Sequence, residues 1–349
     1  MKAAVYTDLE KITVADKPKP APGPGQVLVK IERCGICGSD MHGYHTGPVL
    51  DLIYTFGTVM GHECSGVVAE VGEGVANFKP GDRVIVLPGA TCGTCDTCLD
   101  GKSNICLNAI VNCVGLTAMG DGAFAEYMLV KSPAQMLYAL PEGVSFEEGA
   151  IVEPLSTSLH GVRQSRFKPG DLTLVIGAGP IGLGTIQFLK IGGAGKIIVM
   201  EISPERSKAA LELGADLVLN PETEGANLPV KFAELTAGLG ADIVFECSGV
   251  PFGFQNSLNF VKYGGQVMVV GIAEDTMVSP LTVSLKEVEM KGSFAYTADE
   301  FKMVIGFLTQ KKINTKSMIS EVIRLDDIQE KGFQRLASSR DVVKILVRP

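Results

Sequence analysis

The hydrophobic and polar positions of the chain follow two different rhythms, and the change falls near residue 172. Before it, short apolar or alternating runs are separated by proline and glycine, as in PKPAPGPGQ and KPGDRV, a pattern typical of strands joined by turns. We expect strands at residues 2–6, 27–32, 66–71, 83–87 and 123–130, followed by a helix at 146–162. The first part of the chain is therefore predicted to be rich in β-structure.

From residue 172 onward, apolar runs alternate with helical patterns. The expected strands are residues 172–176, 197–200, 217–219, 243–245 and 267–270, with a sixth candidate at 288–294. The expected helices between them are residues 181–190, 204–213, 230–236 and 254–261. This alternation predicts an α/β fold with a doubly wound parallel sheet.

The end of the chain has a helical pattern at residues 299–310 and then a strand-like run, VVKILV. We therefore expect the tail to rejoin the first domain. The predicted division places residues 1–155 and 293–349 in one domain and residues 156–292 in a nucleotide-binding domain. A length of 349 residues supports two domains, because single cores rarely grow that large.

Composition narrows the possible partners. The net charge of −8 argues against nucleic acids and anionic membrane surfaces. No apolar run approaches the roughly 20 residues of a membrane span, and the first residues lack the apolar core of a signal peptide. The nine cysteines then indicate metal binding or catalysis before disulfides. We expect a cytoplasmic protein with a small-molecule substrate.

A glycine-rich turn follows the predicted strand at residues 172–176 and has the form G-x-G-x-x-G. Gly177 permits a tight turn, Gly179 lets a pyrophosphate approach the backbone, and Gly182 lets the next helix pack on the strand. Pro180 and Ile181 open that helix, whose free N–H groups favour a phosphate. Glu201 ends the second strand and suits the ribose hydroxyls of NAD, while it would repel the 2′-phosphate of NADP. The alternative is an ordinary βα turn with a surface glutamate.

Four cysteines form a compact C-x2-C-x2-C-x7-C pattern in a segment with almost no apolar residues. They are Cys92, Cys95, Cys98 and Cys106. Four thiolates predict a closed, tetrahedral structural zinc site that organises a lobe without a core of its own. An iron–sulfur cluster or two disulfides remain alternatives.

A second set of metal ligands is scattered along the chain: Cys37, His62, Glu63 and Glu153. A catalytic zinc needs three protein ligands and one open position, which a cysteine, a histidine and a glutamate satisfy. Each residue alone has an ordinary explanation as a core thiol, a loop histidine or a helix acid. Cys34 and Cys37 could also form a redox dithiol.

The motifs GxCGSDxH, GHExxGxVxxVGxxV, the four-cysteine lobe, EPLS and GAGPIGL occur in this order. Together they resemble the zinc-dependent medium-chain alcohol dehydrogenase family over essentially the whole length, most closely its sorbitol, threonine and (R,R)-2,3-butanediol dehydrogenase branch. The resemblance implies a GroES-like catalytic domain, a Rossmann domain, NAD, and two zinc ions per chain, one catalytic and one structural. It also implies a homotetramer, with a dimer as the alternative.

The resemblance further implies residue roles. Cys37, His62 and either Glu63 or Glu153 would hold the catalytic zinc, with Glu63 otherwise close beside it, and Ser39 and His42 would relay a proton. Additional cofactor contacts are expected at Arg206, Ser248, Gly271 and Ile272. Residues 45–59, which include Tyr54 and Phe56, are expected to shape the pocket entrance.

The implied activity is reversible, zinc-assisted hydride transfer from a secondary alcohol, vicinal diol or polyol to NAD, giving a ketone or acyloin. Two alternatives are weighed against it. One is a zinc-free NAD(P)H enone or quinone reductase on the same fold, and the other is a zinc-ribbon interaction module.

Overall fold

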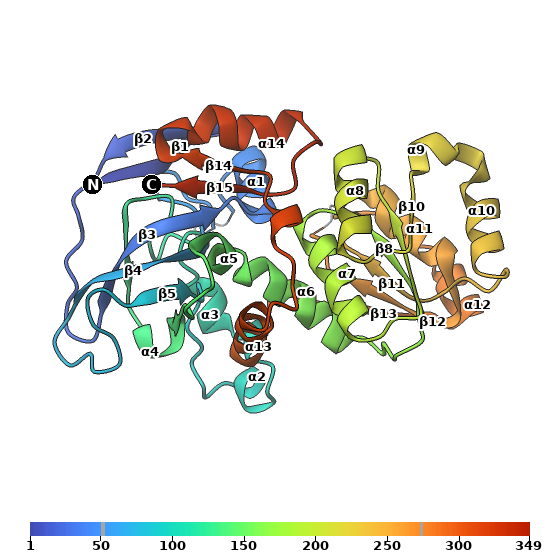
Figure 1. Cartoon of the computed structure of the whole chain (residues 1–349), viewed down its shortest axis with the longest axis horizontal. Coiled ribbons are helices and arrows are strands. Elements are labelled where there is room, and N and C mark those ends of the chain that lie inside the picture. Colours follow the sequence, from blue (N-terminus) through green and yellow to red (C-terminus); the bar gives the residue numbers. More distant parts are fainter. Residues whose placement is uncertain (50–52, 273–274) are drawn as a thin grey trace.

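Two sheets organise the chain, and the computed structural model describes residues 1–49, 53–272 and 275–349 (Figure 1). Both chain ends lie beside the first sheet, and the second sheet occupies the opposite half of the molecule. Within the described residues, no helix is long and apolar enough to cross a membrane.

The first sheet contains seven strands in the order β14-β15-β3-β4-β5-β7, with β6 paired to β3. Their bounds are β3 (Val27–Gly35), β4 (Glu63–Val71), β5 (Arg83–Val86), β6 (Tyr127–Val130), β7 (Leu137–Ala139), β14 (Glu321–Arg324) and β15 (Ile345–Arg348). A hairpin of β1 (Lys2–Asp8) and β2 (Lys11–Asp16) lies alongside. The antiparallel pairing of β15 with β3 places the end of the chain beside its beginning.

The second sheet contains six strands in the order β10-β9-β8-β11-β12-β13, and every pairing in it is parallel. Their bounds are β8 (Leu172–Ile176), β9 (Lys196–Met200), β10 (Leu217–Leu219), β11 (Ala241–Glu246), β12 (Val261–Val269) and β13 (Glu289–Gly292). This sheet confirms the predicted α/β class with a doubly wound parallel sheet.

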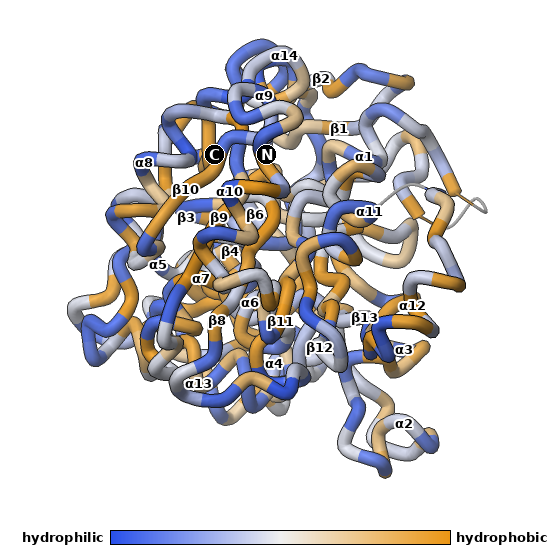
Figure 2. The backbone as a smooth tube through the Cα atoms, turned by 90° about the vertical axis from the view of Figure 1, so that its right-hand side faces the viewer, coloured by the Kyte–Doolittle hydropathy of each residue, from blue (hydrophilic) through white to orange (hydrophobic). Residues whose placement is uncertain are grey.

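Helices cover both faces of the parallel sheet. On one face lie α6 (Val152–Gln164), α7 (Pro180–Ile191) and α8 (Pro204–Leu213), and on the other α10 (Leu228–Leu235), α11 (Pro251–Phe260) and α12 (Pro280–Lys286). Helix α13 (Ala298–Thr309) packs on α6. Successive residues of β8 enter different cores: Val175 faces α6 and α7, while Leu174 and Ile176 face the opposite layer. Burial on both faces explains the uninterrupted apolar run. The parallel strands are largely orange in Figure 2, whereas outer turns are blue.

The remaining helices are short and mostly lie around the first sheet. They are α1 (Gly38–Thr46), α2 (Asp96–Leu99), α3 (Leu107–Val111), α4 (Pro133–Met136), α5 (Phe146–Ala150), α9 (Pro221–Glu224), α14 (Arg335–Ser338) and a π-helix at Ile328–Gln334. The sequence pattern did not predict α1, because GSDMHGYHT has no apolar stripe.

The helix predicted at residues 146–162 is two helices. Ile151, with φ −96° and ψ 5°, separates α5 from α6. The break places Glu153 in the first turn of α6. Helix α6 then continues across the predicted domain boundary at residues 155 and 156, and the boundaries themselves remain predictions.

Candidate active site

A cleft of about 2090 Å³ is lined by residues of both halves of the molecule. Its walls include Cys37, His62 and Glu153 from one half and Gly177 and Glu201 from the other. Candidate metal ligands and the glycine-rich turn therefore share one cavity. Such a cavity, with a few convergent polar groups, is the expected form of a small-molecule site.

Three predicted ligands come together in this cleft. One ligand atom each from Cys37, His62 and Glu63 lies within 4.8 Å of the others. Cys37 is the N-cap of α1, and its backbone N–H donates to the Asp40 carboxylate at 2.9 Å. Glu63 begins β4 opposite Gly35 of β3, where a Cβ would lie 2.1 Å from Glu63 Oε2. The bare backbone of Gly35 leaves room for this carboxylate.

The imidazole of His62 is buried and lies between two polar neighbours. Its Nδ1 is 3.6 Å from Asp40 Oδ1, and its Nε2 is 3.4 Å from Ser39 Oγ. Burial lowers the pKa of His62, but the negative charges of Asp40 and Cys37 outweigh burial and raise it well above its ordinary value. Burial also raises the pKa of Asp40 to about 6.

Sequence reasoning did not assign a role to Lys344, which pairs with Glu63. Its Nζ donates to both Glu63 carboxylate oxygens at 2.7 Å and to the Ile36 carbonyl at 2.9 Å. Both side chains are almost completely buried. The sequence contained one indication of this pair, namely that Lys344 is the single lysine in the apolar run VVKILV. A lysine that is buried requires a partner.

Glu153 lines the same cleft and has a different environment from Glu63. Burial raises the pKa of Glu153 to about 7, against the opposing charge of His62. The neighbouring Tyr296 hydroxyl is buried and has no hydrogen-bond partner among the described residues. Glu153 is not one of the three residues whose ligand atoms lie within 4.8 Å of one another.

The donor set fits a divalent cation. It combines a thiol, an imidazole and carboxylates, which is a combination that binds zinc. Burial is the main cause of the raised pKa values of Asp40 and Glu153, which means that the surrounding protein groups do not fully stabilise their ionised forms. A divalent cation would supply the missing positive charge.

Ser39 and His42 lie three residues apart on α1, and both line the cleft. This spacing places both side chains on the same side of the helix. Ser39 is partly buried beside His62, whereas His42 is exposed. The pair thus extends from the candidate ligand His62 toward solvent.

The four cysteines of the predicted lobe form a second cluster. Their sulfur atoms lie within 4.8 Å of one another, with individual separations of 3.6, 3.8 and 4.0 Å. A tetrahedral zinc with Zn–S bonds of about 2.3 Å requires similar spacings. All nine cysteines are free thiols, so the alternative of two disulfides is wrong.

The glycine turn has the backbone form that the motif predicts. Gly177 adopts φ 89°, and a Cβ on Gly182 would lie 1.9 Å from the Gly177 carbonyl oxygen. A Cβ on Gly179 would meet no atom within 4 Å, so the space beside it is open to a ligand. Pro180 is the first residue of α7, and Ile181 lines the cleft beside it.

Glu201 is buried at the edge of the cleft, and its oxygens accept backbone hydrogen bonds. Oε2 accepts from Ala178 N–H at 2.7 Å, and Oε1 accepts from Ile202 and Ser203 N–H at 2.8 Å. The carboxylate is therefore fixed beside the glycine turn.

The other predicted cofactor residues, Arg206, Ser248, Gly271 and Ile272, also line the cleft. The guanidinium of Arg206 donates two hydrogen bonds to the Val342 carbonyl at 3.0 and 2.8 Å. It thus links α8 to the segment that precedes β15.

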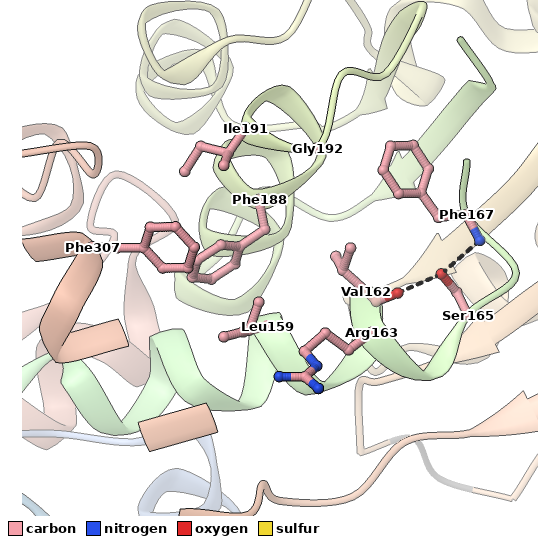
Figure 3. A pocket seen from close by; sticks show the side chains of 9 residues that line it. All are labelled: Leu159, Val162, Arg163, Ser165, Phe167, Phe188, Ile191, Gly192 and Phe307. Carbon is pink, nitrogen blue, oxygen red and sulfur yellow. Dashed lines mark hydrogen bonds between the residues drawn. The ribbon is translucent and has the colours of Figure 1, made fainter. Parts of the chain in front are cut away.

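A smaller hollow of about 280 Å³ lies between α6, α7 and α13 (Figure 3). Its walls are mainly apolar, with Leu159, Phe188 and Phe307 among them. Ser165 Oγ donates to the Val162 carbonyl and accepts from Phe167 N–H, so this hydroxyl is already hydrogen-bonded to the neighbouring backbone. The predicted site residues do not line this hollow, which lacks convergent polar groups.

The predicted pocket segment at residues 45–59 is described except for residues 50–52, which lie outside the described residues. Tyr54 from this segment is buried and its ring packs against Gly43 of α1.

Comparison with known proteins finds two matching families. Residues 23–142 match the alcohol dehydrogenase GroES-like domain, and residues 180–310 match the zinc-binding dehydrogenase family. The chain is 39% identical to (R,R)-butanediol dehydrogenase of Bacillus subtilis (strain 168), with 100% of both chains covered. It is 33% identical to sorbitol dehydrogenase of the same organism, covering 100% of this chain and 97% of the relative.

A solved structure supports the same relationship. It is a putative zinc-binding dehydrogenase from Sinorhizobium meliloti 1021 bound to NADP, with a TM-score of 0.89 and 31% identity. The alignment covers 100% of this chain and 99% of that structure.

Proposed function

Because the chain belongs to the zinc-dependent medium-chain alcohol and polyol dehydrogenases, which are oxidoreductases, we propose that it reversibly oxidises a secondary alcohol or vicinal diol with NAD. The product would be a ketone or, from a diol, an acyloin. One observation carries the proposal: Cys37, His62 and Glu63 converge in the cleft that also contains the glycine turn. The similarity to a butanediol dehydrogenase and a sorbitol dehydrogenase supports this substrate class.

Cys37, His62 and Glu153 would hold the catalytic zinc, with Glu63 close beside it. Lys344 occupies both oxygens of Glu63, which supports Glu153 as the carboxylate ligand. A bound zinc would lower the pKa of the alcohol hydroxyl and make its deprotonation possible near neutral pH. Asp40 would hold His62 in the required orientation from its other ring nitrogen.

The protein side chains would then handle the proton. Ser39 would accept the proton of the alcohol on one lone pair and release its own proton toward His42 and solvent. Because Ser39 contacts His62 and His42 is exposed, their positions suit this direction of transfer.

Glu201 supports NAD as the cofactor. Its fixed carboxylate would face the ribose hydroxyls and repel a 2′-phosphate. A related structure contains NADP, so the preference for NAD over NADP should be measured directly. We expect NADPH to bind less tightly than NADH to this chain. In Glu201→Ala the difference should shrink.

Further proposals follow from the family and the cysteines. Cys92, Cys95, Cys98 and Cys106 would hold a second, structural zinc. Nine free thiols suit a reducing compartment such as the cytoplasm. A homotetramer is proposed from the family resemblance, and sedimentation analysis would distinguish it from a dimer.

The decisive experiment measures metal content and NAD reduction at 340 nm with diols, sugar alcohols and simple secondary alcohols. We expect about two zinc ions per chain in the native protein. The variants Cys37→Ala and His62→Ala should each lose one zinc ion and nearly all activity. The control variant Cys64→Ala changes a buried cysteine of β4 and should retain its zinc and its activity. If both ligand variants keep two zinc ions and full NAD reduction, the assignment of Cys37 and His62 to the catalytic zinc is wrong.

A further inference from the structure

Asn104 joins the cysteine lobe to the opposite half of the molecule. It lies in the 3₁₀ turn Ser103–Ile105, between Cys98 and Cys106. Its Nδ2 donates to the carbonyl oxygen of Phe294 at 2.8 Å, 190 positions further along the chain. Phe294 follows β13, the edge strand of the parallel sheet. Both residues line the cleft, so one side-chain amide connects its two sides.

A second contact fixes the orientation of this amide. Asn104 Nδ2 also lies 3.3 Å from His160 Nε2, and His160 Nδ1 lies 2.8 Å from Glu300 Oε2. Because an ionised carboxylate only accepts hydrogen bonds, the proton of the neutral ring resides on Nδ1, and Nε2 is an acceptor. The two amide hydrogens of Asn104 therefore go to His160 and to the Phe294 carbonyl.

Glu300 holds the other end of the segment that Phe294 begins. Its Oε2 accepts from Thr297 N–H at 2.8 Å and from Thr297 Oγ1 at 3.0 Å. Residues 294–297 are thus hydrogen-bonded at both ends. Between these ends, Ala295 adopts a φ of 51°, in the left-handed region that residues other than glycine rarely adopt. Such a conformation persists only where surrounding contacts determine it.

The segment held in this way is part of the cleft wall. Ser293, Phe294, Ala295 and Tyr296 all line the cleft. The Phe294 side chain is half exposed, and the hydroxyls of Ser293 and Tyr296 are buried without a hydrogen-bond partner among the described residues. Buried hydroxyls normally have a partner, so these two are available to a bound ligand. A shift of the segment would displace both hydroxyls.

We propose that Asn104 is a positioning residue. By holding the Phe294 carbonyl it fixes residues 293–296 where a bound alcohol meets them, so the cysteine lobe helps to determine the shape of the substrate site. The part of this role that concerns the alcohol rests on the proposed function. Among the described residues, Asn104 forms no hydrogen bond with Cys37 or His62, so its effect falls on binding more than on the chemical step.

Hydrogen exchange tests the position of the segment without requiring activity. The peptide of residues 293–297 contains two bonded amides: Ser293 N–H donates to the Val269 carbonyl, and Thr297 N–H donates to Glu300. In Asn104→Ala this peptide should exchange about threefold to tenfold faster, the range that corresponds to one lost hydrogen bond. Asn104→Asp keeps the size of the side chain and removes the donor, so it should show a similar rise. Exchange at the native rate in either variant would overturn the proposal.

Steady-state kinetics test the role in substrate binding. With a diol as substrate, Asn104→Ala should raise KM about threefold to tenfold with a smaller change in kcat. A purely structural role would lower the melting temperature and leave KM unchanged, and that result would overturn the proposal. The zinc content should equal that of the native protein. Loss of a zinc ion would also overturn the proposal, because it would show that Asn104 maintains the cysteine lobe instead.

Asn108→Ala is the matched control. Asn108 lies in α3 of the same lobe, and its Nδ2 donates to the Ala90 carbonyl at 2.9 Å, within the lobe. Its exchange rates and KM should equal those of the native protein. Equal changes in the Asn104 and Asn108 variants would overturn the proposal, because they would indicate a general loosening of the lobe. If exchange rises only in the Asn104 variants but the native protein oxidises no alcohol, the positioning of the segment by Asn104 stands and the proposed function fails.

Discussion

At the scale of single residues, the buried pair of Lys344 and Glu63 is the feature with the largest expected consequence. Burial lowers the pKa of Lys344, but the Glu63 charge outweighs this and raises the net pKa, so the ammonium stays protonated. A buried ion pair adds little or no stability relative to a well-packed apolar pair, yet removal of one partner leaves a buried charge without compensation.

Lys344→Met should therefore destabilise the protein by about 3–5 kcal/mol, because the Glu63 carboxylate would lose its counter-ion. The double variant Lys344→Met/Glu63→Gln should recover most of this loss. Urea unfolding of the metal-free proteins would measure both. Lys331→Met is the control: Lys331 forms an exposed pair with Asp327 at 3.3 Å, and its removal should change stability by less than about 0.5 kcal/mol. A similar effect of both lysine variants would contradict this account.

At the scale of elements, the turn between β8 and α7 combines glycines with different physical roles. Gly182 is required by the fold, since a Cβ there would meet the Gly177 carbonyl oxygen at 1.9 Å. Gly179 has open space around its backbone and is required only when a ligand approaches.

This difference predicts distinct outcomes for two identical substitutions. Gly182→Ala should lower the stability of the protein without cofactor by about 1–3 kcal/mol, because backbone must move. Gly179→Ala should leave that stability nearly unchanged and weaken NADH binding about tenfold or more, a change of about 1.4 kcal/mol. Thermal unfolding and NADH fluorescence titration would measure the two effects. Loss of stability in Gly179→Ala alone would show that the roles are reversed.

The start of α13 is held by several contacts of one carboxylate, Glu300. Thr297 and Glu300 form a capping box, and His160 of α6 contacts Glu300 Oε2 through Nδ1 at 2.8 Å. Burial raises the pKa of Glu300, but the hydrogen bonds from His160 and Thr297 outweigh it, so the net pKa is lowered from 4.5.

A lowered pKa means that Glu300 binds protons more readily in the unfolded chain. Its contribution to stability is therefore present above the unfolded pKa near 4.5 and is lost as the pH falls through the folded value. Glu300→Gln should cost roughly 1–3 kcal/mol at pH 7 and should lose less stability than the native protein between pH 7 and pH 3.5. Melting temperatures across this range would test it, and parallel curves would contradict it.

At the scale of the whole molecule, the cleft joins the two sheets into one functional unit. The C-terminal segment contributes to both halves, because Lys344 bonds to Glu63 and Val342 accepts the hydrogen bonds of Arg206. A ligand that fills this cleft should therefore stabilise the whole chain rather than one half.

NADH at 100 times its Kd should stabilise the protein by about 2.7 kcal/mol, as expected for a ligand that binds only the folded state. Both halves should melt together at the higher temperature, as calorimetry would show. NADPH at the same concentration should raise the melting temperature less, because of Glu201. A shift confined to one of two resolved transitions would contradict the coupling of the halves.

Local patterns in the sequence were sufficient for the fold class, the glycine turn and the cysteine lobe. Alternating strands and helices imply a parallel sheet, and motif residues close in sequence must lie close in space. The six parallel strands and the clustered sulfurs of the lobe agree with those predictions. The short apolar run also located β8 at its observed bounds, Leu172–Ile176.

Contacts between distant residues were decided only by the tertiary structure. Lys344 meets Glu63 across 281 positions of sequence, and Glu63 lies in turn beside Cys37 and His62. Tyr54 packs on Gly43 of α1, and the adjacent Ile53 forms β-bridges with Val49 and Thr117. Sequence periodicity carries information about one element at a time, whereas these contacts depend on how separate elements approach one another in three dimensions.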